Sequence, residues 1–307
     1  MNIRIIVEKW SVRFARIAEW LKHETLPGFG KMSLFDVGRF FVKGLANGTM
    51  GIRASAIAFN FFLAMFPALI FLFTLIPYIP IPDFQTELVQ LLEQLIPSQT
   101  FNIVRDTIDD IAKNPRGGLL SVGCVTTIVL VSNGITAVIK AFNSSINTYE
   151  NRTFINLRVS SLVTMALITI LLSSAIALLI FGRSLLGFLI SRNVIYGFAS
   201  KMLFYMIRWV IILTLCLVSV SVIYYFAPAR HTKMGFISPG AVLATTLLLL
   251  TSAGFGYYLS NFNSYNALYG SIGTLIAILV WLNLNAYILL LGFELNLSIR
   301  VAQKNKI

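Results

Sequence analysis

Apolar residues gather in six long runs along the chain, with shorter polar stretches between them. A helix needs about 20 mostly apolar residues to cross a bilayer, and each run reaches that length. The sequence therefore predicts an all-α, polytopic membrane protein with six transmembrane helices, in a membrane domain formed by residues 53–296. The predicted spans cover residues 54–76, 119–138, 159–181, 203–226, 237–259 and 271–292.

Amphipathic segments precede and interrupt these runs. Residues 1–52 hold two segments with apolar residues at helical spacing, the first strongly basic and the second beginning at Ser33. A basic amphipathic helix is suited to an anionic membrane surface, and an ordinary packing helix is the alternative. Residues 83–113 hold two more apolar stripes, divided by Pro97. We expect a helical hairpin there, outside the membrane, and a short tail at residues 297–307.

The composition agrees with a membrane protein and gives an orientation. Hydrophobic residues make up 57% of the chain and charged residues 12%, with a mean hydropathy of +0.81. Lys and Arg concentrate in residues 1–53, 139–158, 227–237 and the tail. The positive-inside rule then places both termini in the cytoplasm and the hairpin 83–113 outside. This orientation accounts for the net charge of +12, so we expect no nucleic-acid partner.

Few residues suit a metal or a cofactor. Cys124 and Cys216 both lie within apolar runs, where a small hydrophobic role is commoner than a disulfide. The sequence contains no phosphate-binding loop for ATP. Metal-dependent nucleases hold their ions with clusters of His, Asp or Glu, and the segments predicted to be cytoplasmic contain no such cluster. We therefore expect no metal, no cofactor and no enzymatic activity.

Four stretches resemble those of a known family, in the same order along the chain. They are RASAIAFNFFLAMFPALIFL (53–72), SNGITAVIKAFNSSINTYENR (132–152), YYFAPARHTKMGFISPGAVLAT (224–245) and YNALYGSIGTLIAILVWLNLNAYILLLGFELN (265–296). The chain resembles the YihY/BrkB family of bacterial inner-membrane proteins, once labelled ribonuclease BN. The resemblance implies a six-helix domain in the cell (inner) membrane and no settled activity. Asn133 departs from the family pattern, in which a tryptophan or another bulky residue is expected.

Polar side chains inside the apolar runs are the candidate substrate-binding residues, because such groups are costly in a membrane. Each has a structural alternative. Arg208 either binds an anionic group or extends to the membrane surface. Glu294 either pairs with Arg53 or another base, caps a polar network, or carries protons, and the asparagines either bridge helices or line a cavity. The candidates are Arg208, Asn60, Asn133, Asn283, Asn285, Tyr287 and Glu294.

Backbone features add three candidate hinges and one unusual loop. Pro67, Pro228 and Pro239 are either hinges or static bends. The uncharged, aromatic segment 261–270 is expected to be an external loop. It either packs on the membrane surface, plugs the outer mouth of the bundle, or belongs to an aromatic belt. Within the last span, small residues at Gly273 and Ala277 permit another helix to approach closely.

Two functions are carried forward from these observations. The first is transport or flipping of a lipid or a lipid-linked envelope precursor, with membrane lipids, anionic ones included, as the partners. The second is a non-transporting envelope scaffold, which docks a partner protein through residues 83–113. The apolar stripes of that hairpin suit a partner protein and suit packing onto the protein's own spans equally well. Ribonuclease activity is disfavoured by the missing acidic and histidine clusters.

Overall fold

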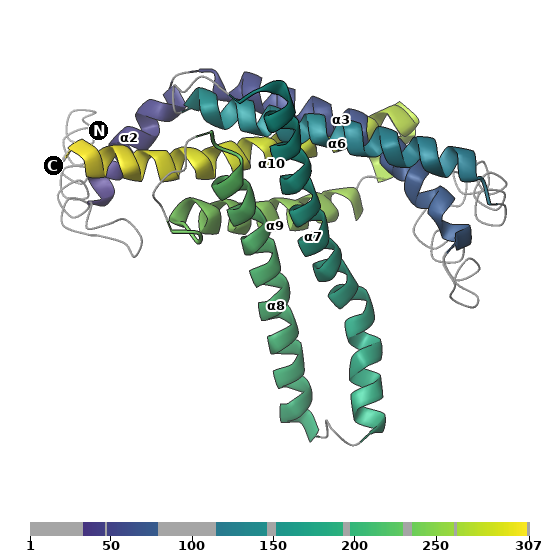
Figure 1. The fold of residues 1–307 in the computed structure, drawn as a ribbon. Helices are drawn as coiled ribbons and strands as arrows, with labels where there is room; N and C mark the ends of the chain where they lie inside the picture. The colour runs from purple at the N-terminus through teal and green to yellow at the C-terminus, as the bar shows by residue number, and fades with distance from the viewer. Residues whose placement is uncertain are drawn as a thin grey trace, which may run out of the picture. The chain divides into compact units, whose positions relative to one another are not determined.

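The chain is all-helical wherever its structure is described. The computed structural model describes residues 33–46, 48–78, 115–145, 152–192, 197–229, 235–260 and 263–305, and their regular elements are helices (Figure 1). The elements are α2 (Leu34–Ala46), α3 (Met50–Leu75), a short 3-10 helix η1 (Ile76–Tyr78), α6 (Gly117–Ser145), α7 (Phe154–Ser191), α8 (Gly197–Phe226), α9 (Pro239–Ser260) and α10 (Asn263–Asn305).

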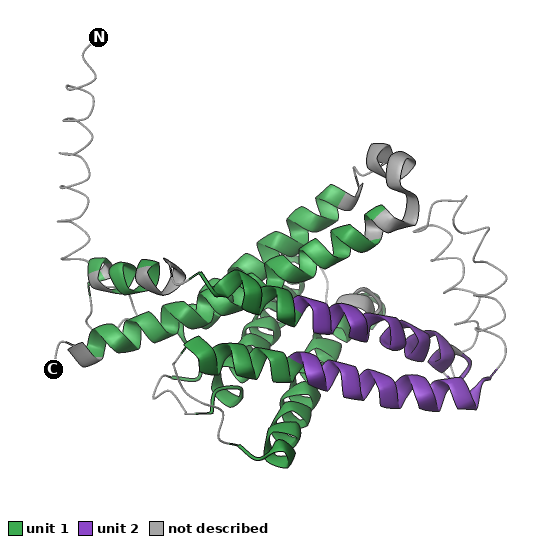
Figure 2. Cartoon of the chain, turned by 90° about the horizontal axis from the view of Figure 1, so that it is seen from above, with its two compact units in different colours: residues 1–57, 135–307 green, residues 58–134 purple. Residues whose placement is uncertain are grey.

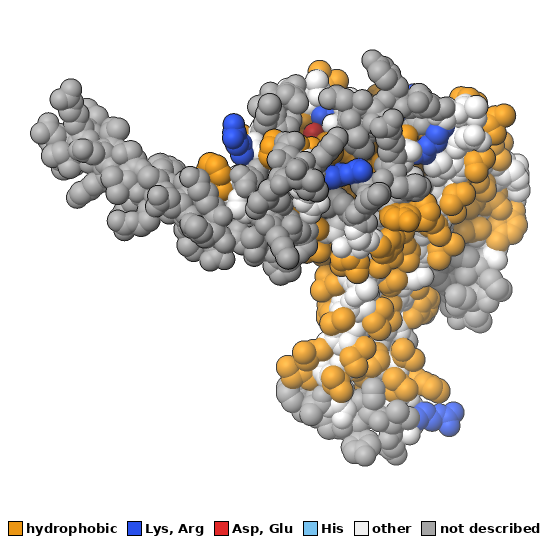
Figure 3. Space-filling model, turned by 60° about the vertical axis from the view of Figure 1, so that its left-hand side comes forward, with side chains coloured by type: hydrophobic (Ala, Val, Ile, Leu, Met, Phe, Trp, Pro, Cys, Tyr) orange, Lys and Arg blue, Asp and Glu red, His pale blue; other side chains and the backbone are white. Residues whose placement is uncertain are grey.

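Six of these helices, α3 and α6 to α10, are long and apolar enough to cross a membrane. They fall on the six apolar runs of the sequence, so the prediction of an all-α fold with six transmembrane helices is confirmed. Much of their apolar surface is exposed. Figure 3 shows many exposed hydrophobic side chains along α7 and α8, with other side chains between them. An apolar surface of this kind is expected where lipid replaces water.

Two helices extend well beyond the apolar runs that predicted them. α7 has 38 residues and α10 has 43. The expectation of an external loop at residues 261–270 is wrong from Asn263 onward, because α10 begins at that residue. No proline interrupts this stretch, so its backbone groups continue the helical hydrogen bonds on the N-terminal side of the apolar run. The predicted helix in the first 32 residues and the predicted hairpin 83–113 lie outside the described residues.

The chain divides into two compact units, shown in different colours in Figure 2. The smaller unit, residues 58–134, holds the second part of α3 and the first part of α6. These two helical segments are in close contact, since a Cβ added at Gly123 would lie 3.3 Å from the backbone of Phe71. Pro67 belongs to this unit, and α3 continues through it to Leu75.

The larger unit, residues 1–57 and 135–307, holds α2, the first turns of α3, the end of α6, and α7 to α10. Within it α7 packs along α8, α9 packs along α10, and α2 packs on the last turns of α10, where Val37, Ile299 and Ala302 form a buried cluster. α9 and α10 meet at Gly240 and Gly292. A Cβ at Gly240 would overlap the Gly292 carbonyl oxygen, so this helix contact requires the absence of side chains.

Candidate functional site

The larger unit contains a buried ion pair between Arg53 and Glu294. Arg53 lies in the first turn of α3, and Glu294 lies in the second half of α10. Their closest atoms, Nη2 and Oε1, are 4.0 Å apart, and their side chains are only 13% and 6% exposed. The separation is at the upper limit for an ion pair, and it falls short of the bidentate geometry that makes such pairs strong.

The Arg53 guanidinium is held mainly by the end of α6. Its Nη1 donates to the Ala141 carbonyl oxygen at 3.0 Å and to the Ser145 hydroxyl oxygen. The Ser145 hydroxyl also donates to the Ala141 carbonyl oxygen at 3.4 Å, so it joins Arg53 to the backbone of α6. The first turn of α3, the last turns of α6 and the second half of α10 therefore converge on one polar cluster.

The larger unit also contains an aromatic cluster contributed by α6, α8 and α10. The rings of Phe142 and Phe293 stack with centroids 4.0 Å apart, and Tyr224 meets both rings edge-on. The Tyr224 hydroxyl donates to the Leu289 carbonyl oxygen at 2.7 Å. Phe293 directly precedes Glu294 along α10. The charged side chains of Arg53 and Glu294 are themselves little exposed, and a buried charge is costly unless it has a counter-ion.

Two asparagines fix the segments that connect to α8 and α9. The Asn143 side-chain oxygen accepts a hydrogen bond from the Ala229 amide at 2.9 Å. Asn296 accepts one from the Gly240 amide and donates one to the Ser238 hydroxyl, both at 2.8 Å. These contacts flank two of the candidate hinges. Pro228, which is fully buried, precedes Ala229, and Pro239 lies between Ser238 and Gly240.

Arg208, a predicted substrate ligand, is buried between α8 and α7. Its Nε donates to the Leu178 carbonyl oxygen at 3.1 Å. Gly182 on α7 leaves room for the side chain, because a Cβ there would lie 2.5 Å from Nε. The guanidinium thus packs against α7. From the sequence alone, extension of this side chain to the membrane surface was the alternative.

The other candidates lie in several different places. Asn283 donates to the Ser55 hydroxyl at 3.0 Å and so links α10 to the start of α3. The Asn285 side-chain oxygen is buried, and no hydrogen-bond partner for it is found in the described part of the chain. Tyr287 is partly exposed. Asn60 and Asn133 belong to the smaller unit.

The structure therefore pairs Glu294 with Arg53. The other candidate residues make their contacts on several different helices. Sequence analysis missed Ser145, Asn296 and Tyr224 as members of the polar network. The only sequence signal for Asn296 was its position two residues after Glu294 at the end of the last apolar run. Among the described residues, no group of three His, Cys, Asp or Glu side chains is placed to hold a metal ion.

Comparison with known proteins places this architecture in a family. A family model named virulence factor BrkB matches residues 41–307. The ribonuclease-like protein YfkH of Bacillus subtilis is 32% identical over 253 residues, which cover 82% of this chain and 90% of that protein. A UPF0761 membrane protein of Aeromonas salmonicida is 25% identical over 301 residues, which cover 94% of this chain and 93% of that protein.

Another relative matches only a short part of the chain. A UPF0761 membrane protein of Xanthomonas campestris is 36% identical over 78 residues, which cover 25% of this chain and 18% of that protein. No solved structure matches the chain. The family model nevertheless extends from α2 through all six long helices to the last residue, and the similarity to YfkH covers most of both chains. The chain is a multi-pass membrane protein and belongs to the virulence factor BrkB family.

Proposed function

We propose that the protein transports or flips a lipid, or a lipid-linked envelope precursor, across the cell (inner) membrane. The observation that carries the proposal is the buried Arg53–Glu294 pair inside helices that are otherwise strongly apolar. Ionisable groups at such places are costly and commonly mark the path of a substrate or ion. The distribution of Lys and Arg along the sequence supports cytoplasmic termini. In the proposal the Arg53–Glu294 pair therefore lies toward the cytoplasmic end of the helices.

The geometry of the pair suits exchange of one anion for another. Arg53 keeps its hydrogen bonds to Ala141 and Ser145 independently of Glu294, whose nearest oxygen is 4.0 Å away. A phosphate group is a bidentate acceptor for a guanidinium. In the proposal a phosphate-bearing headgroup competes with Glu294 for the guanidinium of Arg53.

Arg208 supplies a second buried cation in the proposal. Its Nε donates to the Leu178 carbonyl oxygen of α7, and a guanidinium suits a phosphate group because it is a planar, bidentate donor. Asn60, Asn133, Asn283, Asn285 and Tyr287 are the remaining polar groups proposed to contact the substrate. The proposal assigns no catalytic step to any of them.

A scaffold without transport activity is the second candidate. The observation that favours it is that Asn283, Asn296 and Asn143 each bond a neighbouring segment of the same unit. Such bonds stabilise a helix bundle and need no substrate. In this candidate the ion pair joins α3 to α10, and residues 83–113 are the proposed surface for an envelope protein partner.

Lipid flipping in proteoliposomes distinguishes the two candidates. We expect the wild-type protein to flip phospholipids with a labelled headgroup. Glu294→Gln, Arg53→Ala and Arg208→Ala are expected to lose this activity while remaining folded. Arg39→Ala is the matched control, because Arg39 is an exposed cation on α2 in the same unit. Wild-type rates in all three variants, or no flipping by the wild-type protein, would overturn the proposal and favour the scaffold.

A further inference from the structure

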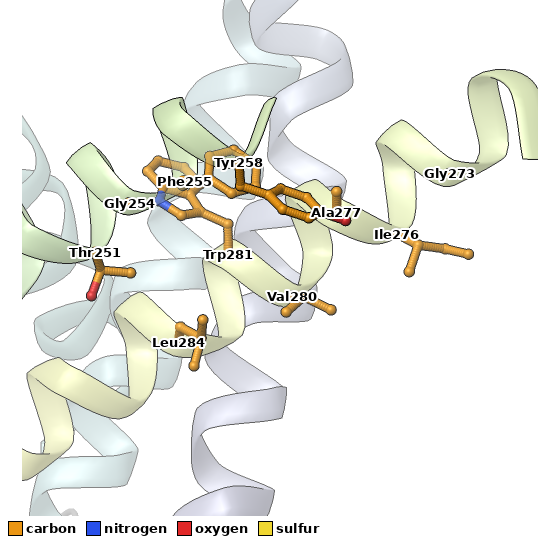
Figure 4. Close-up of a pocket in the computed structure, with 10 residues that line it drawn as sticks. All are labelled: Thr251, Gly254, Phe255, Tyr258, Gly273, Ile276, Ala277, Val280, Trp281 and Leu284. Carbon is orange, nitrogen blue, oxygen red and sulfur yellow. The ribbon is translucent and has the colours of Figure 1, made fainter. Parts of the chain in front are cut away.

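A pocket of about 390 Å³ lies between α9 and α10 (Figure 4), and neither Arg53 nor Glu294 lines it. Its floor is the stacked pair Phe255 and Trp281, whose ring centroids are 5.4 Å apart. The pocket has room because three of its lining residues are small, namely Gly254 on α9 and Gly273 and Ala277 on α10. The volume falls within the roughly 300–1,000 Å³ that is common for small-molecule sites.

The pocket opens sideways onto an apolar surface. Ile276, Val280 and Leu284 line its mouth, and all three side chains are exposed. These residues belong to α10, which is long and apolar enough to cross a membrane. In a bilayer such a surface is covered by acyl chains, so the mouth of the pocket is in continuous contact with them.

The length of the pocket matches one leaflet. Its lining runs from Thr251 to Tyr258 on α9 and from Gly273 to Leu284 on α10. At 1.5 Å per residue these stretches are about 10 and 16 Å long. One leaflet contributes about half of a hydrocarbon core that is about 30 Å thick. Since α9 begins at Pro239, beside Asn296, the pocket lies in the half of the helices farther from Glu294.

We infer that this pocket binds one acyl chain of a membrane phospholipid, from the leaflet opposite the Arg53–Glu294 pair. The chain lies against the Trp281 and Phe255 rings, and its headgroup lies toward the Tyr258 end. The inference does not depend on transport, because a scaffold with the same pocket binds the same chain.

Tryptophan fluorescence gives a direct test. Replacing Trp10, Trp20 and Trp209 by Phe leaves Trp281 as the single tryptophan. In nanodiscs of phospholipid with brominated acyl chains, a chain in the pocket quenches Trp281 by contact. A second protein that keeps only Trp209 reports ordinary lipid contact, because Trp209 is 54% exposed on α8.

Two glycines on α9 provide a matched pair of variants. Cβ atoms at Gly254 and Gly256 meet nothing within 4 Å, so a side chain added at either position begins in open space. Only Gly254 lines the pocket. We expect Gly254→Leu to reduce quenching of Trp281 at least about twofold, since the leucine keeps the chain beyond contact distance of the indole. Gly256→Leu is expected to leave it unchanged, and neither variant changes the quenching of Trp209.

Three results would overturn the inference. Equal quenching in Gly254→Leu and Gly256→Leu means that ordinary surface lipid reaches Trp281 without entering the pocket. Quenching of Trp209 without any quenching of Trp281 means that protein covers the pocket. Loss of a dimer in Gly254→Leu, measured by mass photometry, identifies a second copy as the occupant. If Gly254→Leu fails to fold, Val280→Phe narrows the mouth from an exposed position, and Leu250→Phe is its exposed control.

Discussion

Asn296 on α10 completes the hydrogen bonding of the first turn of α9, because its side-chain oxygen accepts from the Gly240 amide at 2.8 Å. The amides at a helix start have no partner within the helix. Ser238 serves the same turn through a 3.3 Å contact from the Ala241 amide, and Asn296 donates to that serine. One side chain of α10 thus fixes where α9 begins.

Replacing Asn296 is expected to lower the stability of the protein. In Asn296→Ala, the buried Gly240 amide loses its partner, which costs about 1–3 kcal/mol, while the Ser238 hydroxyl keeps its contact with the Ala241 amide. Thermal unfolding in detergent measures the loss. Thr246→Ala is the control, because this exposed threonine bonds only a carbonyl of its own helix. A similar melting temperature in both variants would contradict the role of Asn296.

The Arg53–Glu294 pair is expected to show strong coupling in a double-mutant cycle. Arg53→Met or Glu294→Leu alone leaves one buried charge without its partner, which costs about 3–5 kcal/mol. The double variant removes both charges and is expected to lose less than the sum of the two. Denaturant unfolding of the four proteins gives the coupling free energy. Additive losses would show that the 4.0 Å approach contributes no interaction.

Gly292 is expected to tolerate no side chain. A Cβ there would overlap the Tyr224 hydroxyl and lie 2.8 Å from the Ala244 Cβ, so α9 and α10 must move apart. Overpacking of this kind costs about 1–3 kcal/mol. Gly256→Ala is the control, and it is expected to be neutral or stabilising because alanine favours helix and its Cβ enters open space. Equal melting temperatures for Gly292→Ala and Gly256→Ala would contradict the observed contact.

Gly182→Ala tests the position of Arg208 without removing its charge. The added Cβ lies 2.5 Å from Arg208 Nε and 2.8 Å from Cζ, so the flexible guanidinium moves away from the Leu178 carbonyl oxygen. We expect a small change in stability and a reduced flipping rate. Gly187→Ala on the same helix is the control, since its Cβ meets nothing within 4 Å. An unchanged rate in Gly182→Ala would show that the place of Arg208 is unimportant for transport.

Asn285→Leu is expected to separate stability from activity. The buried oxygen of Asn285 lacks a hydrogen-bond partner in the described part of the chain, and such an atom costs about 1–3 kcal/mol. Leucine removes that cost, so the melting temperature is expected to rise while flipping falls. A lower melting temperature would show that the asparagine is a structural bridge.

The helices were predictable because one physical requirement, the length of apolar chain that crosses a bilayer, defines them. The ends of the helices were not predictable from this requirement. α10 begins at Asn263, eight residues before the predicted span, because a helix continues wherever its backbone bonds are unbroken and not only where side chains are apolar. Charge gave the possible pairing of Arg53 with Glu294. The contact of Asn296 with Gly240 was missed, since it depends on how α9 is aligned along α10, which no local pattern encodes.

The unbroken length of α10 has a mechanical consequence. Trp281, in the floor of the apolar pocket, and Glu294, in the ion pair, lie on one continuous helix. They are 13 residues apart, which is about 20 Å along the axis. A hydrogen-bonded helix turns as a rod, so rotation of α10 about its axis displaces both side chains together. Any ligand that favours one rotational position at the pocket thereby changes the separation of the two charges, and the converse holds equally.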